Sequence, residues 1–180
     1  MTQVNSNLSF AGRRENTGKT IRMDIRRGHF CLWCKDQPTQ EFDTVKGRLT
    51  GISIRKCEAP SGETMFMDIH FTHGETRFDV SALASSSISA ELISKLANIQ
   101  DLSSTIQIEV WPKGSFTNSV VRENGQKLPY RLLPKVERRQ SGFKMTLDTA
   151  ERDKAVMEMI AELNARLAVA RSGGNSGQAD

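Results

Sequence analysis

Apolar and polar residues alternate with a period of two through much of residues 45–123, which is the pattern of half-buried β-strands. Three such runs come first, a stretch with helical spacing follows, and two more alternating runs come after it. The predicted strands are Val45–Cys57, Thr64–His73, Glu75–Leu83, Thr105–Trp111 and Phe116–Glu123, and the predicted helix is Ser87–Ile99. The expected chain order is therefore β-β-β-α-β-β.

This is the chain order of an OB-fold, a five-stranded Greek-key barrel whose surface binds oligonucleotides and oligosaccharides. In the first strand the alternation shifts phase at Thr50-Gly51, which predicts a β-bulge or a sharp bend. After the fifth strand, Asn124-Gly125 predicts a two-residue hairpin turn. We therefore expect a mainly β protein built on an OB-fold-like barrel, with the helix between its third and fourth strands. Fold alone does not give function, so the surface residues must decide it.

Further segments flank the barrel. Residues 1–19 are polar and are predicted to form a flexible arm. Ile21, Met23 and Ile25 begin an alternating pattern that predicts an N-terminal β-hairpin, so the OB-fold domain is expected over 20–133. A basic linker is expected over 134–148, a helix capped by Asp148 or Thr149 over 149–171, and a disordered tail over 172–180.

The C-terminal helix is predicted to be amphipathic. Its apolar residues recur at the narrow spacing of a coiled-coil seam. They are Val156, Ile160, Leu163, Leu167 and Ala170. Two alternatives follow: the helix docks on the barrel, or it pairs with the same helix of another subunit or with a protein partner. The short barrel helix is expected to be capped by Ser87 or Ser89.

Charge is unevenly distributed along the 180 residues, whose net charge is +4. Residues 1–60 carry 11 Lys and Arg against 6 Asp and Glu, residues 61–110 carry 2 against 7, and residues 111–150 carry 8 against 3. Basic charge therefore gathers at both ends of the predicted barrel, which suits a polyanion, although solvated surface charge is an equal alternative.

The expected setting is the cytoplasm, of a host cell if the protein is viral. The N-terminal residues are polar, no apolar run approaches the roughly 18–20 residues that span a bilayer, and the cysteine count, 3, is odd. We therefore expect no membrane association and no disulfide framework.

Motifs that would indicate catalysis are missing. Cys31-Leu32-Trp33-Cys34 has CxxC spacing, but a strand sends residues i and i+3 to opposite faces, and no second pair of ligands follows. His29, His70 and His73 lie in separate segments, and Thr17-Gly18-Lys19-Thr20 lacks the glycine spacing of a phosphate loop. We expect no enzyme activity, no cofactor and no metal site.

Outward-facing aromatic and basic residues indicate single-strand binding, in which bases stack on aromatic rings and cations follow the backbone. Whether each ring is exposed or covered by the terminal elements is left open. The candidates for stacking are Trp33, Phe66, Trp111 and Tyr130. The candidates for phosphate contacts are Arg22, Arg26, Lys35, Lys46, Arg48, Arg55, Arg77, Arg122 and Lys127, which Arg138 and Arg139 would extend.

Three stretches, in this order, resemble the OB-fold single-stranded DNA-binding proteins of tailed bacteriophages. They are the glycine-bearing strand Val45–Ile52, the helix end Leu96–Leu102 and the late hairpin Arg122–Leu128. The resemblance covers about half the chain and implies a non-enzymatic protein that coats single strands in replication or recombination. The tail Ser172–Asp180 departs from related bacterial proteins because it is not acidic and has no hydrophobic end, so recruitment of partners through it is not expected.

Two rival functions remain. The protein could be an interaction module, structural or inhibitory, that assembles through the C-terminal helix. It could also bind RNA, because stacking and phosphate contacts are common to both nucleic acids and only contacts to the 2′-hydroxyl distinguish them.

Overall fold

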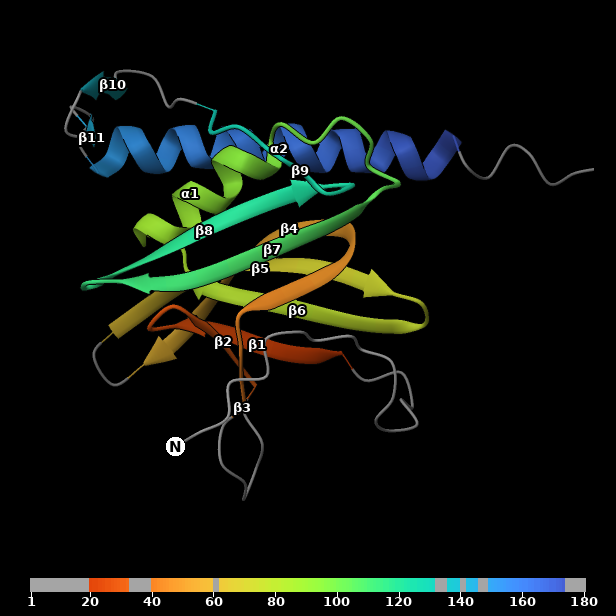
Figure 1. Ribbon diagram of the computed structural model, residues 1–180, viewed down its shortest axis with the longest axis horizontal. Coiled ribbons are helices and arrows are strands. Elements are labelled where there is room, and N and C mark those ends of the chain that lie inside the picture. The colour runs from red at the N-terminus through yellow and green to blue at the C-terminus, as the bar shows by residue number, and fades with distance from the viewer. Residues whose placement is uncertain are drawn as a thin grey trace, which may run out of the picture.

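The structure, a computed structural model, describes residues 20–32, 40–59, 62–131, 136–139, 142–145 and 149–173 (Figure 1). The strands are β1 Ile21–Arg26, β2 His29–Leu32, β3 Gln40–Phe42, β4 Thr44–Ala59, β5 Gly62–His73, β6 Thr76–Leu83, β7 Thr105–Lys113, β8 Phe116–Glu123, β9 Gln126–Lys127, β10 Val136–Arg139 and β11 Gly142–Met145. The helices are α1 Ser87–Leu96 and α2 Thr149–Gly173.

One nine-stranded mixed sheet forms the body of the molecule, in the order β3-β2-β1-β6-β5-β4-β7-β8-β9. Strands β1 and β6 pair in parallel, and the other neighbours in this sheet pair antiparallel. Strands β10 and β11 form a separate two-stranded sheet. The expectation of a mainly β protein with a C-terminal helix is confirmed.

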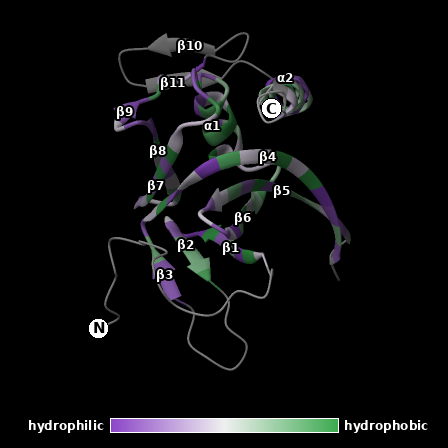
Figure 2. Cartoon of the chain, turned by 90° about the vertical axis from the view of Figure 1, so that its right-hand side faces the viewer, coloured by the Kyte–Doolittle hydropathy of each residue, from purple (hydrophilic) through white to green (hydrophobic). Residues whose placement is uncertain are grey.

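The five predicted barrel strands correspond to β4–β8, and α1 lies between the third and fourth of them as expected. The sheet is strongly curved, with β4 arching over β5 (Figure 2). A closed five-stranded barrel would also pair its end strands, β6 and β8. Within the described residues, however, β6 pairs with β1 and β8 pairs with β9, so the sheet is open and the barrel remains a prediction.

The predicted irregularity in β4 is present. The register between β4 and β5 shifts between Leu49 and Gly51, which is the β-bulge that the phase shift indicates. A second glycine in the same strand is required by packing. A Cβ atom on Gly47 would lie 2.8 Å from the ring of Phe78 and 2.9 Å from the carbonyl oxygen of Thr72, too close for any other residue.

The hairpin predicted before the barrel is formed by β1 and β2, and it closes against β7. Gly28, at the hairpin turn, has a φ of 84°, and a Cβ atom there would lie 2.2 Å from the backbone nitrogen of Pro112. Only glycine allows this close approach of two backbones. The hairpin thus extends the sheet beyond the five predicted strands, because β1 pairs with β6.

Helix α1 begins at Ser87, as predicted, and ends at Leu96, three residues before the predicted end. Its N-cap is Ser86, whose side chain accepts a hydrogen bond from the backbone N–H of Ser89 at 3.3 Å, so the prediction of Ser87 or Ser89 as the cap is wrong. Ser89 instead donates its hydroxyl to the carbonyl oxygen of Leu83 at 2.7 Å. After Leu96 the chain turns, and the backbone N–H groups of Asn98 and Ile99 donate to the carbonyl oxygens of Lys95 and Leu96.

Helix α2 docks on its own chain. Of the two alternatives for its apolar stripe, docking and pairing with another helix, the described fold therefore shows docking. Figure 1 shows α2 beside α1 along one side of the sheet. Val156, Ile160, Leu163 and Leu167 are 1–6% exposed, and they belong to the main hydrophobic core. Ala170, the last predicted member of the stripe, is exposed.

Polar contacts hold α2 in register. Arg166 donates to the carbonyl oxygen of Ala97 at 3.1 Å and also to that of Ile99, and Arg152 donates to the carbonyl oxygen of Ser85 at 2.9 Å. Both ends of α1 are therefore tied to α2. The predicted linker is only partly irregular, since β10 and β11 lie within 134–148. Neither helix of the described part has the length and apolar character needed to cross a membrane.

Candidate nucleic-acid interface

A row of side chains crosses the outer face of the sheet from β6 to β7. Arg77 pairs with Thr72, Thr72 pairs with Arg48, and Arg48 pairs with Thr105. Paired residues on neighbouring strands point to the same face. Arg77 and Arg48 are therefore two strands apart on one surface, separated by a threonine.

A second row runs from β4 to β9. Lys46 pairs with Gln107, Gln107 pairs with Arg122, and Arg122 pairs with Lys127. Lys46 lies two residues before Arg48 on β4, so the two rows meet on that strand and share a face. Together they form what we name the basic track: Arg77, Arg48, Lys46, Arg122 and Lys127.

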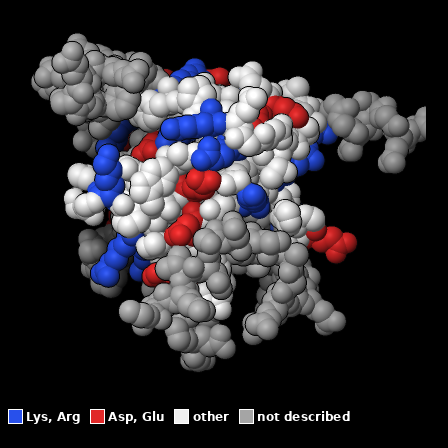
Figure 3. All heavy atoms as spheres, in the orientation of Figure 1, with Lys and Arg blue, Asp and Glu red and all other residues white. Residues whose placement is uncertain are grey.

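Most of the basic track is available to a ligand. Arg77, Arg48, Lys46 and Lys127 are exposed, and Arg77, Lys46 and Lys127 form no hydrogen bond or ion pair with any residue that the structure describes. Arg122 is half-buried and pairs with Glu109, with Nε–Oε1 and Nη2–Oε2 distances of 3.2 and 3.4 Å. Figure 3 accordingly shows basic side chains on either side of a row of acidic ones on the face that carries β7 and β8.

Aromatic side chains flank the turn between β7 and β8. Trp111 is 39% exposed and lies on the same face of β7 as Gln107. Phe116, 67% exposed, pairs across the turn with Lys113, which is also exposed. We name Trp111, Lys113 and Phe116 the turn cluster. Sequence reasoning missed Lys113 and Phe116, although their positions on both sides of Gly114-Ser115 were a usable signal.

Two of the four predicted stacking residues lie elsewhere in the fold. The guanidinium of Arg55 lies 5.2 Å from the ring centroid of half-buried Phe66, so the face of that ring already carries a cation. Tyr130 is half-buried, and burial raises the pKa of its hydroxyl despite a hydrogen bond with Ser94. Trp33 and the cation candidate Lys35 lie outside the described residues.

Three predicted phosphate ligands are already paired with carboxylates on the outer face of β1, β6, β5 and β4. Arg22 lies 3.7 Å from Asp79, Arg26 lies 3.2 Å from Asp24, and Arg55 binds Asp68. They lie outside the two rows of the basic track, and their charge, like that of Arg122, is largely compensated. The side chains of Arg138 and Arg139 are not described.

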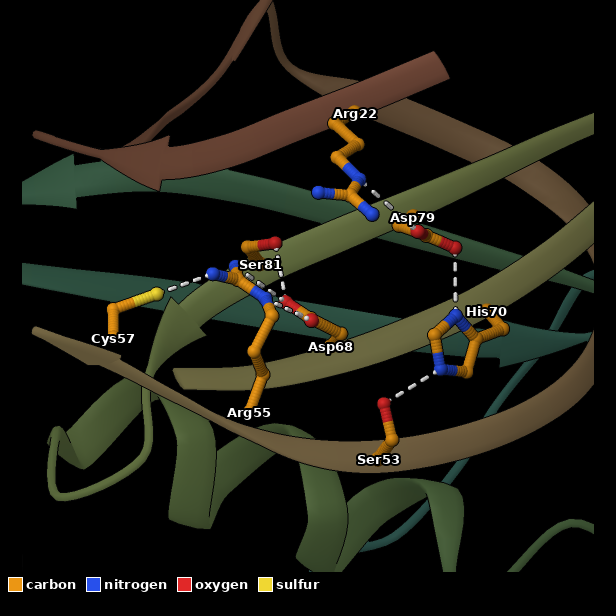
Figure 4. A network of polar contacts seen from close by, with 8 residues as sticks. All are labelled: Arg22, Ser53, Arg55, Cys57, Asp68, His70, Asp79 and Ser81. Atoms are coloured by element: carbon orange, nitrogen blue, oxygen red, sulfur yellow. Dashed lines mark hydrogen bonds and ion pairs between the residues drawn. The ribbon is translucent and has the colours of Figure 1, made fainter. Parts of the chain in front are cut away.

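Asp68 is the centre of that polar surface (Figure 4). It accepts hydrogen bonds from Arg55 at 2.8 and 3.3 Å and from Ser81 at 2.5 Å. Burial acts to raise the pKa of Asp68, but the hydrogen bonds and the positive charge of Arg55 outweigh burial and hold the pKa below its usual value. Arg55 also donates to the sulfur of Cys57 at 2.6 Å.

A chain of hydrogen bonds links Ser53, His70 and Asp79 across three strands (Figure 4). The Ser53 Oγ–His70 Nε2 distance is 2.8 Å and the His70 Nδ1–Asp79 Oδ1 distance is 2.6 Å. The order matches that of a hydrolase triad, which also needs preorganised N–H donors for an oxyanion. Ser53 lies within the ladder, opposite Asp68, rather than at a sharp turn, and these hydrogen bonds join β4, β5 and β6.

Metal chemistry finds no support in the part of the chain that the structure describes, where no group of three or more His, Cys, Asp and Glu residues could hold an ion. Cys31 is buried in β2, and burial raises the pKa of its thiol.

Comparison with known proteins adds nothing to this geometry: no family model, curated protein or solved structure matches the chain. The resemblance to phage single-stranded DNA-binding proteins therefore stays a prediction, and the case for function rests on the arrangement of side chains.

Proposed function

We propose that the protein binds single-stranded DNA, without base specificity and without catalysis, along the basic track and the turn cluster. The observation that carries the proposal is the strand register, which aligns five cations across six neighbouring strands. Adjacent strands are about 4.8 Å apart, so the basic track is roughly 24 Å long from β6 to β9, enough to follow several nucleotides.

The arrangement of strands supports the same function. We take β4–β8 and α1 as an OB-fold unit, in which β7 and β8 are the fourth and fifth strands. The loop between those two strands is one of the loops through which OB-folds bind oligonucleotides. Here that loop carries the turn cluster, with Trp111 and Phe116 exposed for stacking and Lys113 beside them.

The rival assembly function has less support. It requires the apolar stripe of α2 to be accessible, but Ile160 is 5% exposed and Leu163 is 1% exposed against the protein's own core. Replacing either with Asp would therefore unfold the docked helix rather than test assembly. A part in replication or recombination of phage DNA follows only from the sequence resemblance, and we retain it as part of the proposal.

The test is fluorescence anisotropy of labelled oligo-dT, titrated with protein at about 50 and 200 mM salt, beside a duplex of equal length. We expect tight, salt-sensitive binding of the single strand and much weaker binding of the duplex. Equal binding of both, or binding that does not respond to salt, would contradict the proposal. A matching oligo-rU titration separates DNA binding from RNA binding.

A further inference from the structure

A cleft of about 750 Å³ lies at the Arg77 end of the basic track. One wall comes from the bulge of β4 and from β5 and β6, and the other from the C-terminal half of α2. Arg77 and Thr72 belong both to this cleft and to the first row of the track. A single strand of DNA that follows the basic track beyond Arg48 therefore arrives at the mouth of the cleft.

Positive charge is present on both walls. Arg77 comes from β6 and Arg171 from α2, and both side chains are exposed. Neither forms an ion pair or hydrogen bond with another residue of the described part. The acidic residue of the cleft, Asp79, is compensated because His70 bonds it at 2.6 Å and Arg22 lies 3.7 Å from it (Figure 4). An anionic group can therefore use both free guanidinium groups.

Apolar side chains form the floor of the cleft. Ile52, Phe71 and Leu167 line it and are 1–4% exposed. The nearest amide side chain, that of Asn164, is occupied because it forms hydrogen bonds with both the N–H and the carbonyl of Ile52. Among the described residues that line it, the cleft thus has an apolar floor and two exposed cations, and its amide side chain is already engaged.

We propose that this cleft is a nucleotide subsite, which receives one nucleotide of the bound strand with its phosphate on Arg77 and Arg171 and its base over the apolar floor. The volume lies within the range of about 300–1,000 Å³ typical of small-molecule sites. The inference rests on the proposed single-strand binding and deepens it, since α2 becomes part of the binding surface and not only a support for the sheet.

The experiment compares oligo-dT of about 4 to 16 nucleotides in anisotropy titrations. Two variants alter the cleft without touching the track. Gly51→Val adds a side chain to the wall of the cleft, and its Cβ would lie 3.6 Å from His70 and 3.9 Å from Asn164, which are ordinary van der Waals contacts. Arg171→Gln removes its α2 cation. Lys154→Gln, on an exposed position at the other end of α2, is the matched control.

We expect the wild-type protein to gain affinity as the oligonucleotide becomes long enough to enter the cleft. Both cleft variants should lose that gain, binding the longest oligonucleotide at least about fivefold more weakly while binding the shortest as the wild type does. Lys154→Gln should follow the wild type at every length. Thermal unfolding by circular dichroism checks the fold, and if Gly51→Val does not fold, Arg171→Gln decides alone.

Wild-type affinity of the folded cleft variants for the longest oligonucleotide would overturn the subsite and leave the proposed function intact. A wild-type protein that binds no oligonucleotide of any length would overturn both.

Discussion

The side-chain amide of Asn164 forms both outward backbone hydrogen bonds of Ile52: Nδ2 donates to the carbonyl oxygen at 2.7 Å, and the backbone N–H donates to Oδ1 at 3.0 Å. Strand β4 pairs with β7 only as far as Arg48, so beyond that point its second edge has no partner strand among the described residues. Asn164 acts there as a substitute for a strand and fixes the position of α2.

Asn164→Ala should lower the free energy of unfolding by about 1–3 kcal/mol, because the N–H and the carbonyl of Ile52 both lose their partner. Asn164→Asp should cost at least as much, since a carboxylate cannot donate to the carbonyl. Urea denaturation measures the change. Glu158→Gln, on the exposed side of α2, is the control and should stay within about 0.5 kcal/mol of the wild type. Stability equal to that of the wild type in Asn164→Ala would show that this contact does not hold α2.

The double variant Lys46→Gln, Lys127→Gln should bind single strands more weakly and with less response to salt. Each lost phosphate contact should reduce the slope of log affinity against log salt by about 0.7. Anisotropy titrations over a salt series give the slope. Lys154→Gln removes a charge far from the track, and a slope that falls equally in that control would attribute the effect to net charge alone.

Trp111→Ala and Phe116→Ala should each weaken single-strand binding by about 1–3 kcal/mol, the usual contribution of one stacked base. Phe66→Ala should instead lower the free energy of unfolding, because the ring packs under Arg55. Binding and urea denaturation, measured on all three variants, separate the two effects. Binding lost on replacing Phe66 but kept on replacing Phe116 would move the stacking surface to the β5 face.

Asp68 should make stability depend on acid. Its pKa in the folded protein is lowered from a usual value of 3.8, so its contribution is fully present above the pKa of the unfolded chain and is lost as the pH falls through the folded pKa. Asp68→Asn should cost about 1–3 kcal/mol at neutral pH, because the buried bonds to Arg55 and Ser81 weaken. Urea denaturation between about pH 3 and pH 6 measures this. As the pH falls through the acidic part of this range, the free energy of unfolding should decrease less in the variant than in the wild type. Equal decreases would exclude Asp68 as the source of the acid dependence.

The order of elements could be predicted from the sequence because alternation, turns and the bulge are local signals. The phase shift at Thr50-Gly51 and the Asn124-Gly125 turn, where Asn124 has a φ of 50° and Gly125 of 82°, each depend on a few neighbouring residues. The parallel pairing of β1 with β6 could not be predicted in this way, since no short-range pattern selects between distant edges.

The candidate site was predicted in part for the same reason. Alternation places Lys46 and Arg48 outward, and that holds in the structure. Which cations are compensated depends on register between strands: Arg55 meets Asp68 because Ser53 pairs with Asp68 and not with a neighbour two residues away. The cap at Ser86 was missed because three successive serines give equal local signals, and only the contact with Leu83 distinguishes them.

The bond between Ile52 and Asn164 joins residues 112 positions apart, which has a consequence during synthesis. At about 5–20 residues per second, a ribosome needs roughly 6–22 seconds to pass from one to the other. Throughout that interval the nascent chain can form the β4–β5 hairpin, but not the hydrogen bonds with which Asn164 covers the edge of β4. The newly made protein thus passes through a stage in which an open strand can recruit a neighbouring chain, and dense polysomes would make that encounter more frequent.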